Sequence, residues 1–331
     1  MINLIIKDGL GNQMFQYAFA RLLDEKHRER GEHEEIRIVT QFINTRQDEG
    51  NDVRRMSLQH LVLNDDVEVM PASEQQGAMR RFKWRTLWAS GVWEVIKWRL
   101  LHRYDSTDAL AARRGKEGIY YPYGPYTEHP VTLSRRDEKF VFGFFQSIRN
   151  VAPIADILQC ELKVKTEPSA ANCAMLEEIG SDNAVCLHIR RGDFLNPRWK
   201  HLQICDFHYY SKAIDTILAR TEHPVFYVFS NTHADLQWIA RNYQFPQTYP
   251  GTDKPITLKY VDLANPDYEE LRLMYTCKHF IISNSTFSWW AAWLSENKGK
   301  VVCAPERWNM EYADDYKIYD PSWIKVQRLP S

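Results

Sequence analysis

The sequence predicts an α/β protein with parallel sheets and two domains. From about residue 183, strand-like apolar runs alternate with helix-like stretches, and the chain opens with a strand, a glycine turn and a helix. The chain has 331 residues, whereas single hydrophobic cores stop growing at roughly 250–300 residues. We therefore expect one domain over residues 1–150 and a second over 151–331.

Composition is that of an ordinary globular protein, with 44% hydrophobic and 13% aromatic residues. The 42 Lys and Arg nearly balance the 43 Asp and Glu, so no field of the whole protein attracts nucleic acid and any anion site must be local. The six cysteines are widely spaced without a CxxC pair, which favours buried reduced thiols over zinc or redox chemistry. The N-terminus does not resemble a signal peptide, and no run approaches the ~20 apolar residues of a membrane span, so we expect a cytoplasmic protein.

The first expected elements are a buried strand at residues 2–6 and a helix with apolar positions from Met14 to Leu23. Gly9, Leu10, Gly11 and Asn12 lie between them. Unpaired N–H groups at a helix start can face an anion there. An ordinary tight turn is the alternative, and this short pattern by itself favours it.

Residues 45–150 show few clear strands, but one segment within them, 80–103, is both basic and rich in tryptophan. It contains Arg80, Arg81, Lys83, Trp84, Arg85, Trp88, Trp93, Lys97, Trp98, Arg99, Leu100 and Arg103. A helix of this kind can lie on an anionic membrane surface. Equally, it can pack its tryptophans inside the protein while the Lys and Arg stems extend outward.

The second half is more regular. Strands are expected at 184–189, 225–229, 279–283 and 300–304, and helices at 207–220, 233–242, 267–277 and 287–296. Ligands of parallel α/β sheets bind beyond the carboxyl ends of the strands. Two polar clusters stand at such ends, Arg190–Asp193 and Asn284–Thr286.

Side chains alternate along the strand that leads into the arginine cluster, so His188 and Arg190 project together while Arg191 points away. A guanidinium fork matches phosphate oxygens and suits a leaving diphosphate. An ion pair between arginine and Asp193 that only fixes the loop is the alternative.

The second cluster places several hydroxyls at a helix start, with an apolar helix behind them. Together with exposed N–H groups, these hydroxyls would form a neutral phosphate cradle. Helix capping is the alternative. We expect Trp289 and Trp290 to pack in the core rather than to stack on a sugar.

Three motifs together, GLGNQMFQYAFA at 9–20, HIRRGDF at 188–194 and SNSTFSWWAAWL at 283–294, resemble the α1,2-fucosyltransferases of glycosyltransferase family 11, chiefly the bacterial branch. The resemblance implies a GT-B-like fold of two Rossmann-like lobes with the donor cleft between them. It also implies inverting transfer of L-fucose from GDP-fucose to the 2-hydroxyl of a terminal galactose, without a metal or other cofactor, in a bacterial surface polysaccharide or O-antigen unit. The N-terminal lobe would face the acceptor, the C-terminal lobe would bind GDP-fucose, and the chain's end would pack back on the N-terminal lobe.

By the same resemblance, Arg190 contacts the β-phosphate, while Arg191 and Asp193 support the loop. The remaining donor contacts implied are Gly11, Asn12, His188, Glu270, Asn284, Ser285, Thr286 and Ser288. Asp193 and His188 are the nearest candidates for a catalytic base, although no base is evident. The family often carries FSDD after the middle strand, whereas this chain has Phe229-Ser230-Asn231-Thr232, so a role given to those acids does not carry over to this chain by resemblance.

Three other functions compete with this one. A transferase could use another GDP-sugar or make another linkage, and a glycan-binding protein could retain the fold without turnover, although it would not need a diphosphate clamp. A nicotinamide-dependent oxidoreductase is disfavoured because the glycine turn lacks a third glycine and a ribose-binding acid. If residues 80–103 bind a membrane peripherally, a lipid-linked oligosaccharide becomes the expected acceptor.

Overall fold

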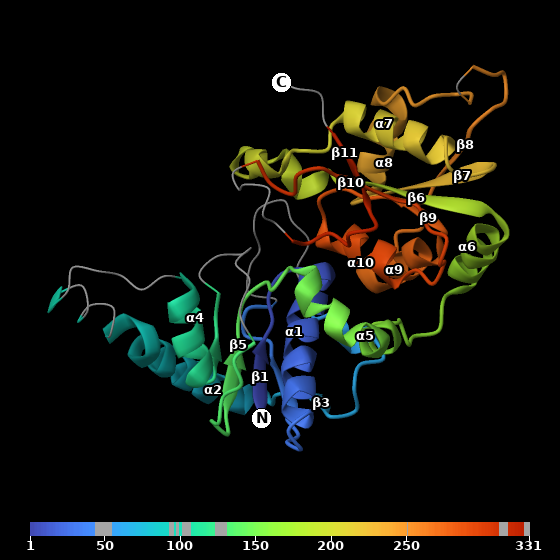
Figure 1. Cartoon of the computed structure of the whole chain (residues 1–331). Coiled ribbons are helices and arrows are strands. Elements are labelled where there is room, and N and C mark those ends of the chain that lie inside the picture. Colours follow the sequence, from blue (N-terminus) through green and yellow to red (C-terminus); the bar gives the residue numbers. More distant parts are fainter. Residues whose placement is uncertain are drawn as a thin grey trace. The chain divides into compact units, whose positions relative to one another are not determined.

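The computed structural model describes residues 1–43, 55–92, 96, 99–100, 107–122, 131–249, 251–310 and 317–327. It divides between Leu162 and Lys163 into two α/β units, and each unit has a parallel sheet with helices packed on it (Figure 1). The α/β class with parallel sheets is therefore confirmed.

The N-terminal unit contains a five-stranded sheet in the order β3-β2-β1-β5-β4. Its strands are β1 (Ile2–Ile5), β2 (Ile36–Val39), β3 (Val67–Val69), β4 (Ile119–Tyr120) and β5 (Lys139–Val141). Its helices are α1 (Leu10–Arg28), α2 (Ala72–Thr86), a π-helical turn η2 (Leu87–Val92), α4 (Thr107–Lys116) and α5 (Ala155–Glu161), with short 3-10 turns η1 (Leu58–His60), η3 (Ile148–Asn150) and η4 (Ala152–Ile154). The central strand β1 is fully buried, as expected for an apolar run covered on both faces.

A buried ion-pair network keeps α5 in the N-terminal unit. The Arg21 guanidinium on α1 donates to Glu161 at 3.0–3.1 Å, and the Tyr17 hydroxyl donates to the same carboxylate at 2.6 Å. Because these contacts bind residues 155–161 to α1, the division falls after Leu162 rather than at the expected 150/151 boundary.

The C-terminal unit contains a six-stranded parallel sheet in the order β11-β10-β9-β6-β7-β8. Its strands are β6 (Asn183–Ile189), β7 (Pro224–Ser230), β8 (Thr257–Tyr260), β9 (His279–Ile281), β10 (Val302–Pro305) and β11 (Ile324–Val326). Its helices are α6 (Ala170–Ser181), α7 (Phe207–Leu218), α8 (His233–Asn242), α9 (Asp267–Thr276) and α10 (Thr286–Leu294), with 3-10 turns η5 (Gly192–Leu195) and η6 (Pro197–Leu202). Strand order reverses between β6 and β9, as in a Rossmann fold.

Two expectations about side-chain burial are decided by this packing. Trp289 and Trp290 are fully buried on α10, so their assignment to the core is confirmed. Cys160 and Cys173 are exposed free thiols, so the expectation of buried thiols is wrong for these two.

The chain's end belongs to the second sheet. Strand β11 pairs in parallel with β10, with Ile324 opposite Cys303, and the C-terminal unit runs from Lys163 to the end of the chain. The expected return of the chain's end to the N-terminal lobe stays a prediction, and residues 328–331 lie outside the described residues. Among the described helices, none has the length and apolarity needed to cross a bilayer.

Candidate donor site at the sheet switch point

The two polar clusters lie on neighbouring strands of the C-terminal sheet. The arginine loop follows β6, and the Asn284–Thr286 turn follows β9, which pairs directly with β6. Since β6 and β9 are the strands between which the strand order reverses, their carboxyl ends form the crevice where open α/β sheets bind ligands.

The two arginines of the loop have different surroundings. Arg191 donates from Nε to Asp235 on α8 at 3.3 Å, and its guanidinium carbon lies 3.3 Å from the Trp238 ring centroid. Arg190 is half-buried and lies over the Phe194 ring at 5.3 Å. Arg191 therefore supports the loop, as the alternation of side chains along the strand predicts. Since Arg191 is held by these scaffold contacts, Arg190 is the candidate for binding phosphate.

The loop conformation depends on Gly192. Its φ is +47°, and a Cβ there would meet Asn231 atoms at 3.1 Å, so a side chain would be strained both by conformation and by contact. Asn231 also accepts a hydrogen bond from the Arg191 backbone N–H at 3.0 Å. The asparagine that stands in place of the family's acid thus shapes the loop. Asp193 lies in η5, but its side chain is outside the described part of the structure.

His188 lies inside the sheet rather than at its surface. Its Nδ1 is hydrogen-bonded to the Ser283 hydroxyl on the β9 side at 2.9 Å, linking the two strands. Burial, reinforced by the Arg190 charge, lowers the pKa of His188 to about 3. A neutral, weakly basic imidazole of this kind is a poor proton acceptor at neutral pH, which argues against His188 as the base.

Most polar side chains of the turn before α10 are buried, and two of them bond within the protein. The Asn284 amide donates to the backbone carbonyls of Leu202 at 2.8 Å and Trp308 at 3.0 Å. The Ser288 hydroxyl is fully buried and donates to the Ser285 carbonyl at 3.3 Å. The side chains of Asn284 and Ser288 hold the fold, so the expected cradle is reduced to Ser285 and Thr286.

The two remaining members are Ser285, which is also buried, and Thr286. The Ser285 hydroxyl accepts from the Phe287 backbone N–H at 3.4 Å as the N-cap of α10, which confirms the capping interpretation. Thr286 is half-buried at the first position of the helix. The start of α10, with its positive dipole end, can still accept an anion beside Arg190.

Glu270 adds a carboxyl group near this crevice. It lies in the first turn of α9 and is half-buried. Burial, together with the Asp267 carboxylate, raises its pKa to about 8, while the Arg190 charge acts in the opposite direction. Its neighbour Glu269 is instead buried against Thr166 at 3.0 Å and Arg272 at 3.3 Å. Glu270 is therefore available to a ligand, whereas Glu269 holds the fold.

In the N-terminal unit, the glycine turn also follows the central strand of a sheet. Gln13 fixes the turn by donating to the Asp8 carbonyl at 2.8 Å, and Asn12 accepts from the Gln146 amide at 2.7 Å. The Lys7 ammonium lies 3.8 Å from the Phe144 ring centroid. Gly11 is buried in the first turn of α1. Lys7 and Gln146 were missed from the sequence; Lys7 stands two residues after β1, whereas Gln146 stands in the loop after β5 and is brought to Asn12 only by the fold.

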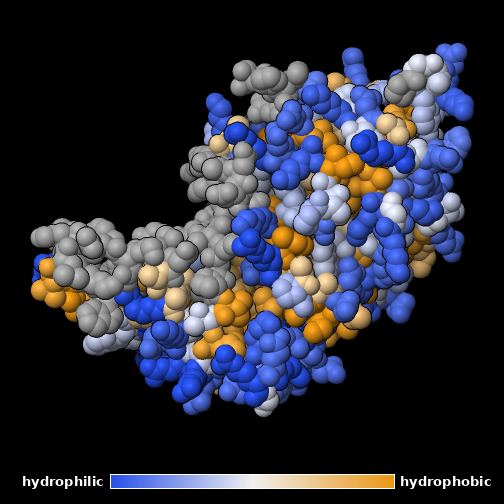
Figure 2. All heavy atoms as spheres, viewed as in Figure 1, coloured by the Kyte–Doolittle hydropathy of each residue, from blue (hydrophilic) through white to orange (hydrophobic). Residues whose placement is uncertain are grey.

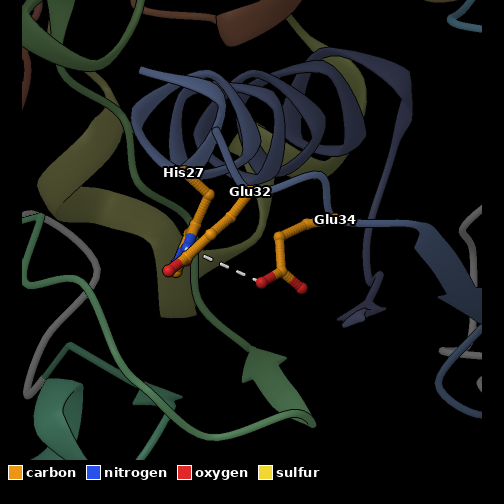
Figure 3. Close-up of side chains that lie close together, drawn as sticks. All are labelled: His27, Glu32 and Glu34. Carbon is orange, nitrogen blue, oxygen red and sulfur yellow. Dashed lines mark hydrogen bonds and ion pairs between the residues drawn. The ribbon is translucent and has the colours of Figure 1, made fainter. Parts of the chain in front are cut away.

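One group of metal-ligand side chains occurs in the described residues, and it belongs to the N-terminal unit. His27, Glu32 and Glu34 point toward one another (Figure 3), and the His27 Nδ1 lies 2.6 Å from Glu32 and 3.6 Å from Glu34. Glu34 also forms a buried ion pair with the Lys139 ammonium. This cation already compensates the carboxylate, so the group is an ion-pair network.

Comparison with known proteins identifies the family. The model for glycosyl transferase family 11 matches residues 124–327. The chain belongs to glycosyl transferase family 11. This match covers both motifs of the C-terminal unit and all six strands of the sheet that carries them.

Curated relatives of this family 11 protein are distant. The O-antigen biosynthesis glycosyltransferase WbnK of Escherichia coli is 25% identical, over 97% of this chain and 99% of the relative. An α-1,2-colitosyltransferase of the same species is 30% identical over 44% of this chain and 48% of the relative. The human galactoside α-(1,2)-fucosyltransferase 1 is 33% identical over 34% of this chain and 28% of the relative. Among solved structures, the fucosyltransferase NodZ from Bradyrhizobium aligns with 88% of this chain and 91% of its own at 12% identity and a TM-score of 0.47.

Proposed function

We propose that this family 11 glycosyltransferase moves L-fucose from GDP-fucose to the 2-hydroxyl of a terminal galactose, with inversion at the anomeric carbon. The observation that carries the proposal is the meeting of the Arg190 loop and the α10 N-terminus at the β6/β9 switch point. A guanidinium and a helix N-terminus side by side suit a diphosphate, which a glycan-binding protein does not need.

In the proposed reaction, the bond between the anomeric carbon and the β-phosphate oxygen breaks, and the electron pair leaves with GDP. The acceptor oxygen forms the new bond from the opposite face of the sugar. Negative charge develops on the diphosphate, where Arg190 and the α10 N-terminus stabilise it. Removing one such donor costs about 3–4 kcal/mol of transition-state stabilisation.

The other site residues have supporting roles in this proposal. Arg191 and Asp193 hold the loop, Ser285 and Thr286 bind the phosphates, and Glu270 contacts the guanosine. Gly11 and Asn12 contact the donor from the N-terminal unit. The hydroxyl proton of the acceptor is transferred to Asp193 or to water. His188 is a poor base because its pKa is low.

We propose an acceptor belonging to a bacterial surface polysaccharide or O-antigen unit, as the name of the full-length relative WbnK suggests. The acceptor is lipid-linked, and the reaction takes place in the cytoplasm with peripheral contact at the inner membrane through residues 80–103.

The test is incubation of the protein with GDP-fucose, lactose and EDTA, following GDP release and the linkage of the product. We expect fucose on the galactose 2-hydroxyl, a loss of at least 100-fold with Arg190→Ala, and no loss with Arg220→Ala, an exposed arginine at the end of α7. Absence of GDP release with every galactoside tried would overturn the proposed donor and acceptor. Loss of activity in EDTA that returned with a divalent cation would overturn metal independence.

Transfer of colitose is the second candidate, because a colitosyltransferase is 30% identical over nearly half of this chain. Colitose is fucose without its 3-hydroxyl, so the two donors differ by one polar group. Comparing kcat/KM for GDP-fucose and GDP-colitose under the same conditions decides between them.

A further inference from the structure

The outer face of α2 and of the residues after it carries a row of exposed apolar side chains, the apolar stripe. Its described members are Trp84 (59% exposed), Leu87 (50%), Trp88 (65%), Val92 (36%), Ile96 (37%) and Leu100 (74%). Within α2 and η2, spacings of three and four residues place Trp84, Leu87, Trp88 and Val92 on one side of the chain. Exposure of Trp84 and Trp88 shows that the packing interpretation is wrong for these two, while the side chains of Trp93 and Trp98 lie outside the described residues.

The opposite face of α2 is already packed. Met79 and Phe82 are buried, and the Phe82 ring lies 5.7 Å from that of Phe140 and 6.1 Å from that of Tyr121. Arg81 and Arg85 fix the same helix through Glu138, at 2.8 and 3.3 Å. The inner face of α2 thus holds the helix in place, and the apolar stripe does not take part in this packing. In Figure 2, apolar atoms are exposed at the left edge of the molecule, in the N-terminal unit.

Two cations beside the apolar stripe differ from Arg81 and Arg85. Arg80 and Lys83 are exposed and have no acidic partner among the described residues. Together with Trp84 they line a surface hollow of about 640 Å³, which is completed by Gln41, Ser73, Gln76, Gly77 and Met79. Among the described residues, the lining of the hollow contains two cations and no acid, which favours an anionic occupant.

We propose that this surface docks on an anionic lipid bilayer. The apolar stripe enters the interface between headgroups and acyl chains, where tryptophan rings are favoured. Arg80 and Lys83 bind lipid phosphates at the hollow. A second copy of the chain fits less well, since a symmetric contact would bring the same cations together. This docking does not depend on the donor or acceptor proposed above.

The test is flotation of the full chain with vesicles of phosphatidylcholine containing 30% phosphatidylglycerol, compared with pure phosphatidylcholine. We expect binding to the anionic vesicles that weakens with salt, and at least tenfold weaker binding to the neutral ones. Trp84→Ala with Trp88→Ala, and separately Arg80→Glu with Lys83→Glu, should each weaken binding at least tenfold. Because the assay measures binding and not turnover, its result is independent of the transferase proposal.

A matched control distinguishes docking through this surface from an effect of the protein's net charge. Arg30→Glu with Lys298→Glu makes the same change in net charge at two other exposed positions and should leave vesicle binding unchanged. Equal loss in this control, or no loss in either test variant, would overturn the proposal. So would a dimer, seen by sedimentation velocity, that dissociates in the double tryptophan variant while vesicles are not bound. Circular dichroism verifies that each variant is folded.

Discussion

Replacing Glu270 by glutamine tests whether this carboxyl group is protonated in the folded protein. Burial and Asp267 raise its pKa from an ordinary 4.5 to about 8, so at pH 5–8 folding takes up a proton that the unfolded chain lacks. The unfolded state then binds fewer protons than the native state, and the free energy of unfolding falls as pH rises from about 4.5 to about 8.

The size of the effect follows from the pKa difference. Each pKa unit corresponds to about 1.4 kcal/mol, which sets an upper limit of about 5 kcal/mol. Because the side chain is only half-buried, solvent screening reduces the expected effect to about 2 kcal/mol. Glutamine cannot ionise, so the wild type should lose about 2 kcal/mol relative to Glu270→Gln between pH 5 and pH 8.5.

Urea unfolding of both proteins at several pH values measures this difference, since groups common to both cancel. Glu177→Gln, at an exposed glutamate of α6, serves as the matched control and should follow the wild type in its pH dependence. The reasoning is refuted if the wild type and Glu270→Gln stay parallel within about 0.5 kcal/mol. Glu270 would then be ionised in the native state, with the Arg190 charge outweighing burial.

Three further substitutions test contacts that hold the site and the units. Gly192→Ala should lower the free energy of unfolding by about 1–2 kcal/mol in thermal denaturation, because Gly192 has a positive φ. Gly180→Ala is the control, since no atom lies within 4 Å of its new Cβ, and it should cause no loss of stability. An equal loss in both variants would contradict this prediction. Asn284→Ala leaves two backbone carbonyls without their donor and should cost about 2–4 kcal/mol in urea unfolding, whereas a loss below about 1 kcal/mol would show that water replaces the amide. Glu161→Gln weakens the buried pair with Arg21, which keeps Asp24 and Glu25 as partners. The free energy of unfolding in urea should therefore fall by about 1–3 kcal/mol, and an unchanged value would contradict the role given to this network.

Local pattern in the sequence predicted much of the fold of the C-terminal unit. Strands β6, β7, β9 and β10 and helix α8 occur where apolar runs and helical spacing placed them, because strands buried on both faces read as continuous apolar runs. Strand β8 was not predicted, because it is an edge strand with partly exposed, polar residues. Strand β2 was not predicted either, since its four residues include a charged arginine.

For the candidate site, the sequence by itself determined which residues stand at the strand ends and that Arg190 and Arg191 diverge, since alternation along a strand is a local property. Only the tertiary structure decided which polar side chains face inward. Asn284 bonds a carbonyl 82 residues earlier in the chain and Ser283 bonds a histidine 95 residues earlier, contacts that no short pattern encodes. The low pKa of His188 and the raised pKa of Glu270 likewise arise from burial by elements distant in sequence, because desolvation depends on everything packed around a group.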